Sequence, residues 1–178
     1  MKVTINESSL ELVEGDITQQ DTEAIVNAAN SSLLGGGGVD GAIHRAAGPD
    51  LLEECRTLGG CPAGEARITK GYRLKSQYVI HTVGPVYHGG RQDEAGLLAA
   101  AYRSSLELAA QHRVRSVAFP SISTGAYGYP LDQAARIALR TVIDTLGEHP
   151  EIELVRFVLF GQHAYDVYER ALVETLAA

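Results

Sequence analysis

Cysteine is scarce in this sequence, and its scarcity excludes two kinds of site. The 178 residues include only two cysteines, Cys55 and Cys61, which are separated by five residues. One such pair indicates neither a zinc site nor a disulfide framework, so we expect two reduced thiols that pack in the core. The six histidines show no metal-ligand spacing either. We therefore expect no bound metal and no other cofactor.

Positive charge is scarce as well. Fifteen Lys and Arg residues against 22 Asp and Glu residues give a formal net charge of −7, and only Lys2, Lys70 and Lys75 are lysines. The chain thus lacks the broad basic footprint of a nucleic-acid-binding protein. The absence of interleaved aromatic and basic residues disfavours an RNA-associated regulator. An anionic ligand would have to be held locally, by backbone amides and helix dipoles.

Long apolar runs are missing too. No stretch approaches the ~20 residues of a membrane span, and the opening segment MKVTINESS lacks the apolar region of a signal peptide. We therefore expect no membrane contact and a cytoplasmic location. Because the 178 residues show no repeat, low-complexity tract or linker, we expect one domain over residues 1–178.

Short apolar segments alternate with amphipathic segments along the chain. We expect strands at 3–5, 10–14, 23–27, 66–70, 77–83, 115–120 and 153–160. We expect helices from about residue 40 to Gly48, from there through Leu58, and at 94–112, 131–146 and 164–176, with Gly147 as a C-cap. This alternation predicts an α/β protein, in which a mostly parallel sheet lies between layers of helices. The first two strands are expected to form a hairpin at the edge of the sheet.

Parallel sheets bind ligands in the crevice outside the carboxyl ends of their strands. The segment after the third expected strand contains four consecutive glycines, Gly35–Gly38. Glycine lets the backbone approach a ligand closely, and successive N–H groups before a helix N-terminus bind anions. The run is a weak dinucleotide fingerprint because it begins eight residues after the strand, and no Gly-Lys pair exists for a P-loop. A flexible surface loop is the alternative interpretation.

Asp40 and His44 are four residues apart, so on a helix they share a face. A carboxylate–imidazole pair beside an anion cradle suggests a nucleotide-like ligand and chemistry on it. Taken alone, Asp40 is equally typical of a helix N-cap, and Asn27 and Asn30 are typical of a turn. His81 lies within an apolar strand, so we interpret it as a core residue with satisfied hydrogen bonds.

A second loop of small residues, Ser121–Gly128, also follows a strand and precedes a helix. It offers hydroxyls, unhindered amides and one aromatic ring. Two such loops facing each other could hold a diphosphate from both sides with N–H donors alone. Phe160, at the end of the last strand, is either a core residue or an exposed platform on which a base stacks.

Together these segments resemble the macrodomain family, and within it the MacroD-type ADP-ribosyl hydrolases. The matching segments run in the family's order over nearly the whole chain: Gly15–Thr18, Ala24–Asn30, Gly35–His44, Cys61–Ala66, His81–Pro85 and Pro120–Pro130. The resemblance implies a three-layer α/β/α fold with a mixed, mostly parallel central sheet. The departures are mild, with Tyr127 where some members have Phe and Tyr87 where many have Trp.

The resemblance also implies how ADP-ribose would bind. Asp16 would accept the adenine amino group, Ile17 would lie beside it, and Phe160 would stack on the ring. Tyr127 would lie against the distal ribose. The other implied ligand-binding residues are Asn27, then Gly37, Gly38 and Val39 of the glycine-rich segment, and Ser121, Ser123, Thr124, Gly125 and Ala126 of the second loop.

Three residues match the family's catalytic set. Asn30 and Asp40 match the pair that positions the distal ribose and the attacking water, and His44 matches a residue that assists Asp40. Because a helix N-terminus favours the charged form of a carboxylate, we expect Asp40 to orient water more than to act as a strong base. The base is left open among Asp40, His44 and the ligand's own phosphate.

The resemblance therefore implies a hydrolase that needs no metal or other cofactor. Family members remove ADP-ribose from modified Asp and Glu side chains and deacetylate O-acetyl-ADP-ribose, so the expected partners are ADP-ribose, O-acetyl-ADP-ribose and mono-ADP-ribosylated proteins. A monomer is our default expectation. The alternative is a module that reads ADP-ribose without cutting it, which would not require the set of Asn30 and Gly37–Asp40 that is complete here.

Overall fold

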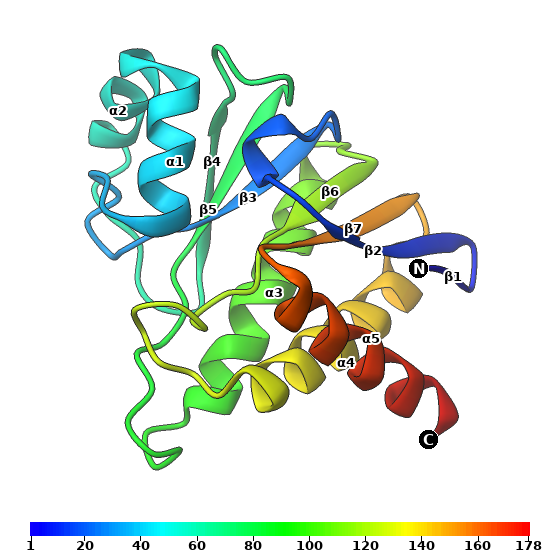
Figure 1. The fold of residues 1–178 in the computed structure, drawn as a ribbon. Helices are drawn as coiled ribbons and strands as arrows, with labels where there is room; N and C mark the ends of the chain where they lie inside the picture. The colour runs from blue at the N-terminus through cyan, green and yellow to red at the C-terminus, as the bar shows by residue number, and fades with distance from the viewer.

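The computed structural model describes residues 1–178, and a seven-stranded sheet lies at its centre (Figure 1). The strand order is β1-β2-β7-β6-β3-β5-β4. The inner five strands are parallel to one another, and the two edge strands, β1 and β4, are antiparallel to their neighbours. The strands are β1 (Lys2–Ile5), β2 (Ser8–Glu14), β3 (Ala24–Ala28), β4 (Ala66–Lys70), β5 (Tyr78–Thr82), β6 (Ser116–Phe119) and β7 (Leu154–Leu159).

Helices cover both faces of this sheet. The helical elements are η1 (Ile17–Gln19), α1 (Gly38–Ala47), α2 (Pro49–Arg56), α3 (Glu94–Gln111), α4 (Leu131–Glu148) and α5 (Gln162–Ala177). Helices α3, α4 and α5 pack on one face over a core of 29 buried residues, and α1 and α2 pack on the other over a core of 14. The predicted three-layer α/β/α fold with a mixed, mostly parallel sheet is confirmed.

Strand β3 shows how the sequence builds both cores at once. Successive side chains of a strand point to opposite faces, and all but the last residue of β3 are buried. Ala24 and Val26 belong to the larger core, whereas Ile25 belongs to the smaller one. Asn27 is the next residue on the side of Ile25, so the alternation directs its amide towards α1 and α2.

The bounds of several helices differ from the prediction by one or two residues. Gly147 lies inside α4, which continues to Glu148 and ends at His149, so its expected role as a C-cap is wrong. No left-handed residue is needed there, because the N–H of His149 bonds normally to the carbonyls of Thr145 and Leu146. Helix α5 begins at Gln162 rather than at residue 164.

The carboxyl ends of the five parallel strands lie along one edge of the sheet, which is where the loops expected to bind a ligand begin. The ends of β2 and β7 are joined by a 3.0 Å hydrogen bond from the N–H of Gly15 to the carbonyl of Leu159. The ends of β6, β3 and β5 follow in order along the same edge. None of the helices combines the length and apolar character that crossing a membrane would require.

Candidate functional site

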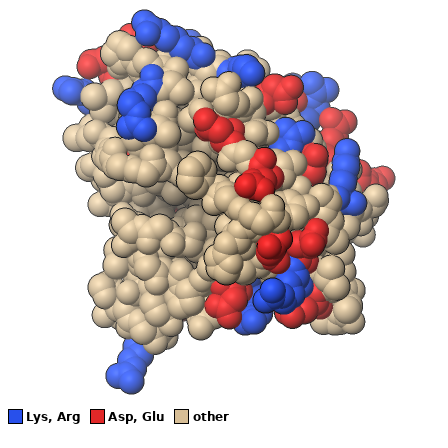
Figure 2. All heavy atoms as spheres, in the orientation of Figure 1, with Lys and Arg blue, Asp and Glu red and all other residues tan.

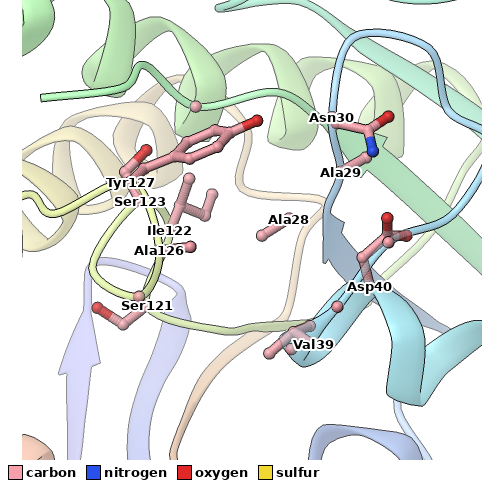
Figure 3. A pocket seen from close by; sticks show the side chains of 15 residues that line it. Ala28, Ala29, Asn30, Val39, Asp40, Ser121, Ile122, Ser123, Ala126 and Tyr127 are labelled. Carbon is pink, nitrogen blue, oxygen red and sulfur yellow. The ribbon is translucent and has the colours of Figure 1, made fainter.

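A cavity of about 290 Å³ opens at the carboxyl ends of β3, β5 and β6 (Figure 3). Asp40 is the only charged residue that lines it. The hollow on this face of the molecule is bordered by uncharged residues (Figure 2). The lining residues are Ala28, Ala29, Asn30, Gly36, Gly37, Gly38, Val39, Asp40, Gly84, Ser121, Ile122, Ser123, Gly125, Ala126 and Tyr127.

One wall of the cavity is the glycine loop, residues 30–37, together with the first turn of α1. Gly37 is the N-cap of the helix and Gly38 its first residue, so the predicted start near Asp40 is two residues late. The N–H groups of the first turn have no partner within the helix and favour an anion. Helix and loop are closely packed, because a Cβ added to Gly41 would lie 2.5 Å from the carbonyl oxygen of Gly36.

The opposite wall is the facing loop, residues 120–130. The hydroxyl of Tyr168 donates to Ser121 Oγ over 2.8 Å, and the hydroxyl of Tyr102 accepts from the N–H of Ile122 over 3.0 Å. Burial raises the pKa of both tyrosines, so their hydroxyls stay protonated. Two core side chains thereby hold the facing loop in place from behind.

Ser123 is the most unusual residue of the facing loop. Its φ is 67°, in the left-handed region that residues other than glycine rarely adopt. Its Oγ is buried and has no hydrogen-bond partner, although the residue lines the cavity. A strained residue with an unused hydroxyl at a cavity wall is typical of a ligand-binding position.

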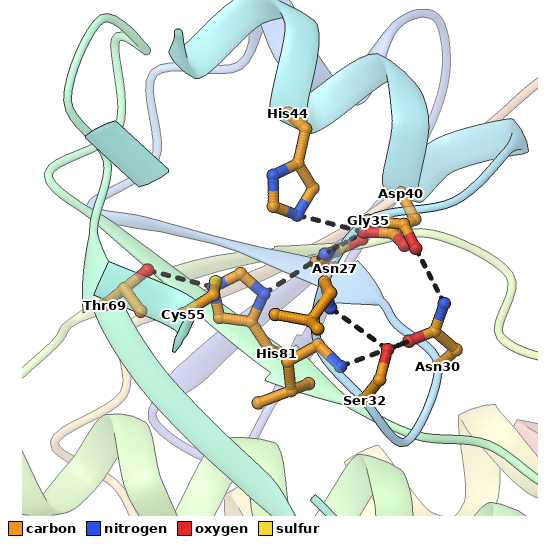
Figure 4. Close-up of polar contacts among 11 residues, drawn as sticks. Asn27, Asn30, Ser32, Gly35, Asp40, His44, Cys55, Thr69 and His81 are labelled. Carbon is orange, nitrogen blue, oxygen red and sulfur yellow. Dashed lines mark hydrogen bonds and ion pairs between the residues drawn. The ribbon is translucent and has the colours of Figure 1, made fainter. Parts of the chain in front are cut away.

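The carboxylate of Asp40 lies at the base of the cavity, in the first turn of α1. It makes no capping bond, so the alternative interpretation as an N-cap is wrong. Its Oδ1 accepts a 2.8 Å hydrogen bond from Asn27 Nδ2, and His44 Nε2 lies 3.4 Å from the same oxygen (Figure 4). The shared helix face predicted for Asp40 and His44 is therefore confirmed, although His44 does not line the cavity.

The second oxygen of Asp40 faces the same space as Asn30. A Cβ added to Gly36 would lie 3.1 Å from Asp40 Oδ2 and 3.4 Å from Asn30 Nδ2. Asn30 in turn donates to the carbonyl of Gly35 over 2.7 Å and accepts from the N–H of Leu33 over 3.1 Å. Asn30 thus holds the turn of the glycine loop, as the sequence suggests, and also reaches the cavity.

Asn27 is placed differently from the expectation. We expected it among the ligand-binding residues, but it is fully buried and does not line the cavity. Its amide contacts Asp40 and His81 behind the cavity wall. The reason is the strand alternation described above, which turns Asn27 into the layer beneath α1. His81 is buried with hydrogen bonds to its ring nitrogens, as predicted.

Asp16, Ile17 and Phe160 lie further along the same sheet edge, at the ends of β2 and β7. The side chain of Phe160 is 92% exposed, which excludes the core interpretation and leaves the ring free to stack. Asp16 caps η1 by accepting from the N–H of Thr18 over 2.9 Å. These residues do not line the cavity itself.

The structure brings ten of the predicted site residues to the cavity wall: Asn30, Gly37, Gly38, Val39, Asp40, Ser121, Ser123, Gly125, Ala126 and Tyr127. Thr124 does not line it, because its hydroxyl bonds back to Ser121. Five lining residues escaped the prediction: Ala28, Ala29, Gly36, Gly84 and Ile122. Gly84 could have been predicted, since it is a glycine directly after an expected strand. The structure shows why a glycine is needed there, because a Cβ would collide with Ser123. No three His, Cys, Asp or Glu side chains are grouped so as to hold a metal ion.

The sequence is similar to several known proteins. The Macro domain family model matches residues 26–138, which is more than half of the chain. A Macro domain-containing protein of Chlorobaculum tepidum is 63% identical over 160 residues, covering 90% of this chain and 93% of that protein. Another, from Methanosarcina mazei, is 52% identical over 176 residues, covering 99% and 94%.

The fold is similar to solved structures as well. A mutant macrodomain of Oceanobacillus iheyensis with ADPR is 48% identical, with a TM-score of 0.96 over 100% of this chain and 99% of that chain. The same organism's macrodomain with ADP gives a TM-score of 0.96 over 99% and 96%. A Trypanosoma brucei macrodomain in complex with ADP-ribose is 48% identical, with a TM-score of 0.87 over 92% of this chain and 68% of that chain.

Proposed function

The chain belongs to the Macro domain family, and we propose that it binds ADP-ribose and hydrolyses esters formed on the distal ribose. The substrates of this proposal are proteins mono-ADP-ribosylated on Asp or Glu side chains, and O-acetyl-ADP-ribose. We also propose that the chain is a macrodomain of the MacroD type and that residues 1–178 form a single macrodomain. The observation that carries the hydrolytic part is that Asp40 Oδ2 and Asn30 Nδ2 lie 3.1 Å and 3.4 Å from the position that a Cβ on Gly36 would take, and that all three residues line the cavity.

The proposed binding mode follows the edge of the sheet. Adenine would lie between Asp16 and Phe160, because these two residues follow paired strand ends and the Phe160 ring is exposed. The diphosphate would lie between the first turn of α1 and the facing loop. No Lys or Arg lines the cavity, so backbone N–H groups and the helix dipole would hold the phosphates. ADPR and ADP-ribose in macrodomain structures 48% identical to this chain support this ligand.

The distal ribose would then lie between Asn30, Asp40 and Tyr127. The Tyr127 ring extends across the cavity towards the side on which Asn30 lies (Figure 3). This placement puts the ester of a modified ribose beside the second oxygen of Asp40.

In the proposed reaction, water attacks the acyl carbon of the ester. The bond between that carbon and the ribose oxygen breaks, the ribose oxygen takes up a proton, and a free carboxylic acid and ADP-ribose leave. Asp40 Oδ2 accepts a hydrogen bond from the attacking water, and the Asn30 amide holds the water or a ribose hydroxyl. Correct positioning of a bound nucleophile accounts for a large part of such rate enhancements.

Release of ADP-ribose from a Glu-linked mono-ADP-ribosylated protein, measured beside calorimetric binding of ADP-ribose, tests the proposal. We expect Asp40→Ala to lose more than about tenfold in turnover and to keep most of its affinity for ADP-ribose, since the phosphates and adenine bind elsewhere. Asp144→Ala is a matched control, because Asp144 is exposed on α4.

Three outcomes decide between the functions. Release by the wild type, lost on Asp40→Ala with binding retained, supports the hydrolase. Binding without release by the wild type replaces the hydrolase with a module that reads ADP-ribose. No binding of ADP-ribose would overturn both.

A further inference from the structure

A continuous line of buried polar groups runs behind Asp40, on the side away from the cavity (Figure 4). Asn27 Nδ2 lies 2.8 Å from Asp40 Oδ1 and 3.1 Å from His81 Nδ1. His81 Nε2 lies 2.9 Å from the hydroxyl of Thr69, which lies 3.1 Å from the carbonyl of Lys70. Asn27 and His81 are fully buried, and they are direct neighbours in the parallel register of β3 and β5.

The donors and acceptors of this line can be arranged in only one sequence. The Asp40 carboxylate accepts, so one hydrogen of the Asn27 amide is directed to it and the other to His81 Nδ1. Nδ1 must then carry the lone pair, and the ring hydrogen is on Nε2. That hydrogen is donated to the hydroxyl of Thr69, whose own hydrogen goes to the carbonyl of Lys70.

The Asn27 amide separates the ring from the Asp40 carboxylate, and burial favours this neutral tautomer over the protonated ring. Burial, together with the nearby imidazole of His44, lowers the pKa of His81 to about 3. The thiol of Cys55, 3.8 Å from Nε2, is uncharged, since burial and the charge of Asp40 raise its pKa to about 11. The imidazole is therefore neutral at neutral pH.

The orientation of the Asn27 amide depends on these two acceptors. Its own carbonyl oxygen, Oδ1, is buried without a hydrogen-bond partner, so no bond to Oδ1 holds the side chain. A rotated amide would direct Oδ1 at the Asp40 carboxylate and at His81 Nδ1, which are both acceptors. Without the acceptor nitrogen of His81, only the single bond to Asp40 would fix the amide.

We propose that His81 is a positioning residue: its Nε2–H tautomer, held by Thr69, fixes the Asn27 amide so that this amide holds Asp40 Oδ1 and leaves Oδ2 directed to the cavity. The consequence for turnover rests on the proposed function of the site. His81 itself touches no part of the cavity.

Three variants test this line. His81→Leu removes both ring nitrogens from a buried position at similar volume. His81→Gln offers an oxygen to Asn27 and an N–H to Thr69, so it preserves the pattern of donors and acceptors. Thr69→Val removes the acceptor that selects the tautomer while leaving Asn27, His81 and Asp40 in place.

For release of ADP-ribose from the Glu-linked protein, we expect kcat to fall on the order of ten- to a hundredfold in His81→Leu, with KM and the calorimetric Kd of ADP-ribose nearly unchanged. We expect His81→Gln to recover most of this loss, and Thr69→Val to show a smaller one. A role confined to packing predicts instead that His81→Leu keeps its kcat whenever it is folded. That result would overturn the proposal.

Nitrogen-15 NMR of the wild type provides a readout that does not depend on hydrolysis. We expect the His81 ring to show hydrogen on Nε2 and a bare Nδ1, and the side-chain amide signals of Asn27 to shift in His81→Leu and return in His81→Gln. Hydrogen on Nδ1 of the wild type would overturn the inference even if turnover is normal. If the wild type shows no turnover, the proposed function fails, and the NMR result alone decides the positioning role. If His81→Leu does not fold, the kcat of Thr69→Val and the wild-type tautomer decide it.

Discussion

At the scale of single residues, Ser123 combines strain with an unused polar atom. A left-handed backbone costs a residue other than glycine roughly 1–2 kcal/mol, and Ser123 keeps this conformation at φ 67°. Its carbonyl accepts from the N–H of Tyr129 over 2.9 Å, which closes the turn of the facing loop. The strained residue keeps a buried hydroxyl without a partner beside Gly84, at the wall of the proposed diphosphate site.

Ser123→Gly separates these two properties. Relief of the backbone strain stabilises the folded variant by about 1 kcal/mol, and the higher entropy of the unfolded glycine chain destabilises it by about 1 kcal/mol. We therefore expect the free energy of unfolding to change by less than about 1 kcal/mol. Loss of the hydroxyl removes a hydrogen bond worth about 0.5–1.5 kcal/mol, so the Kd of ADP-ribose should rise about two- to tenfold. Chemical denaturation and calorimetry measure the two quantities. An unchanged Kd would show that the hydroxyl makes no bond to the ligand.

At the scale of elements, the loop between β5 and α3 is organised around one carboxylate. Glu94, the first residue of α3, is 1% exposed and accepts from the N–H groups of His88 (2.7 Å) and Gly90 (2.9 Å), and from that of Gln92. The bond from His88 is the main cause that holds the pKa of Glu94 at about 2, below its ordinary 4.5. The loop also meets the facing loop, where the N–H of Tyr87 donates to the carbonyl of Tyr127 over 2.9 Å.

Glu94→Gln removes the charge from this loop. Because the folded pKa is lowered, the stabilising contribution of Glu94 is complete above about pH 4.5 and is lost as the pH falls towards about 2. We expect Glu94→Gln to have a lower Tm than the wild type at neutral pH, and the gap in Tm to shrink below about pH 4.5. Glu107→Gln, on the exposed side of the same helix, is the control. A gap that stays constant down to pH 2 would contradict the role of the charge.

The elements themselves were largely predictable, and the contacts between them were not. Apolar strands such as β3 and the punctuation at Gly48-Pro49 are local signals, so their positions follow from neighbouring residues. The bond between Asn27 and His81 depends on the register of β3 against β5, which no local pattern specifies. The sequence therefore placed Asn27 in the right region, next to Asp40, but predicted that its side chain faces the cavity, whereas it points away from it. The cavity itself was predictable because strand ends of a parallel sheet meet at one edge.

At the scale of the whole molecule, the formal net charge of −7 opposes the approach of a diphosphate. No Lys or Arg lines the cavity to offset this repulsion, so the ligand would be held by short-range N–H contacts that salt screens little. Salt does screen the long-range repulsion, whose range falls below about 10 Å above about 0.1 M.

We therefore expect the Kd of ADP-ribose to stay constant or to decrease slightly as NaCl is raised from about 0.05 M to about 0.5 M. Calorimetry at constant pH measures it, with adenosine as an uncharged comparison whose Kd should not follow salt. A Kd that rises steeply with salt would indicate that Lys or Arg side chains bind the phosphates, against the binding mode proposed here.

The pairing of β2 with β7 joins a strand near the start of the chain to the last strand, and the terminal amine of Met1 also reaches the hydroxyl of Tyr165 over 3.0 Å. Such long-range pairing closes late in folding, because a large loop must be ordered first. On a ribosome, the walls that carry Asn30, Asp40 and the facing loop would emerge while β2 still lacks its neighbour β7. The two halves of the proposed adenine site, Asp16 and Phe160, can meet only after β7 has emerged, so a nascent chain that ends before β7 cannot assemble the complete proposed nucleotide site.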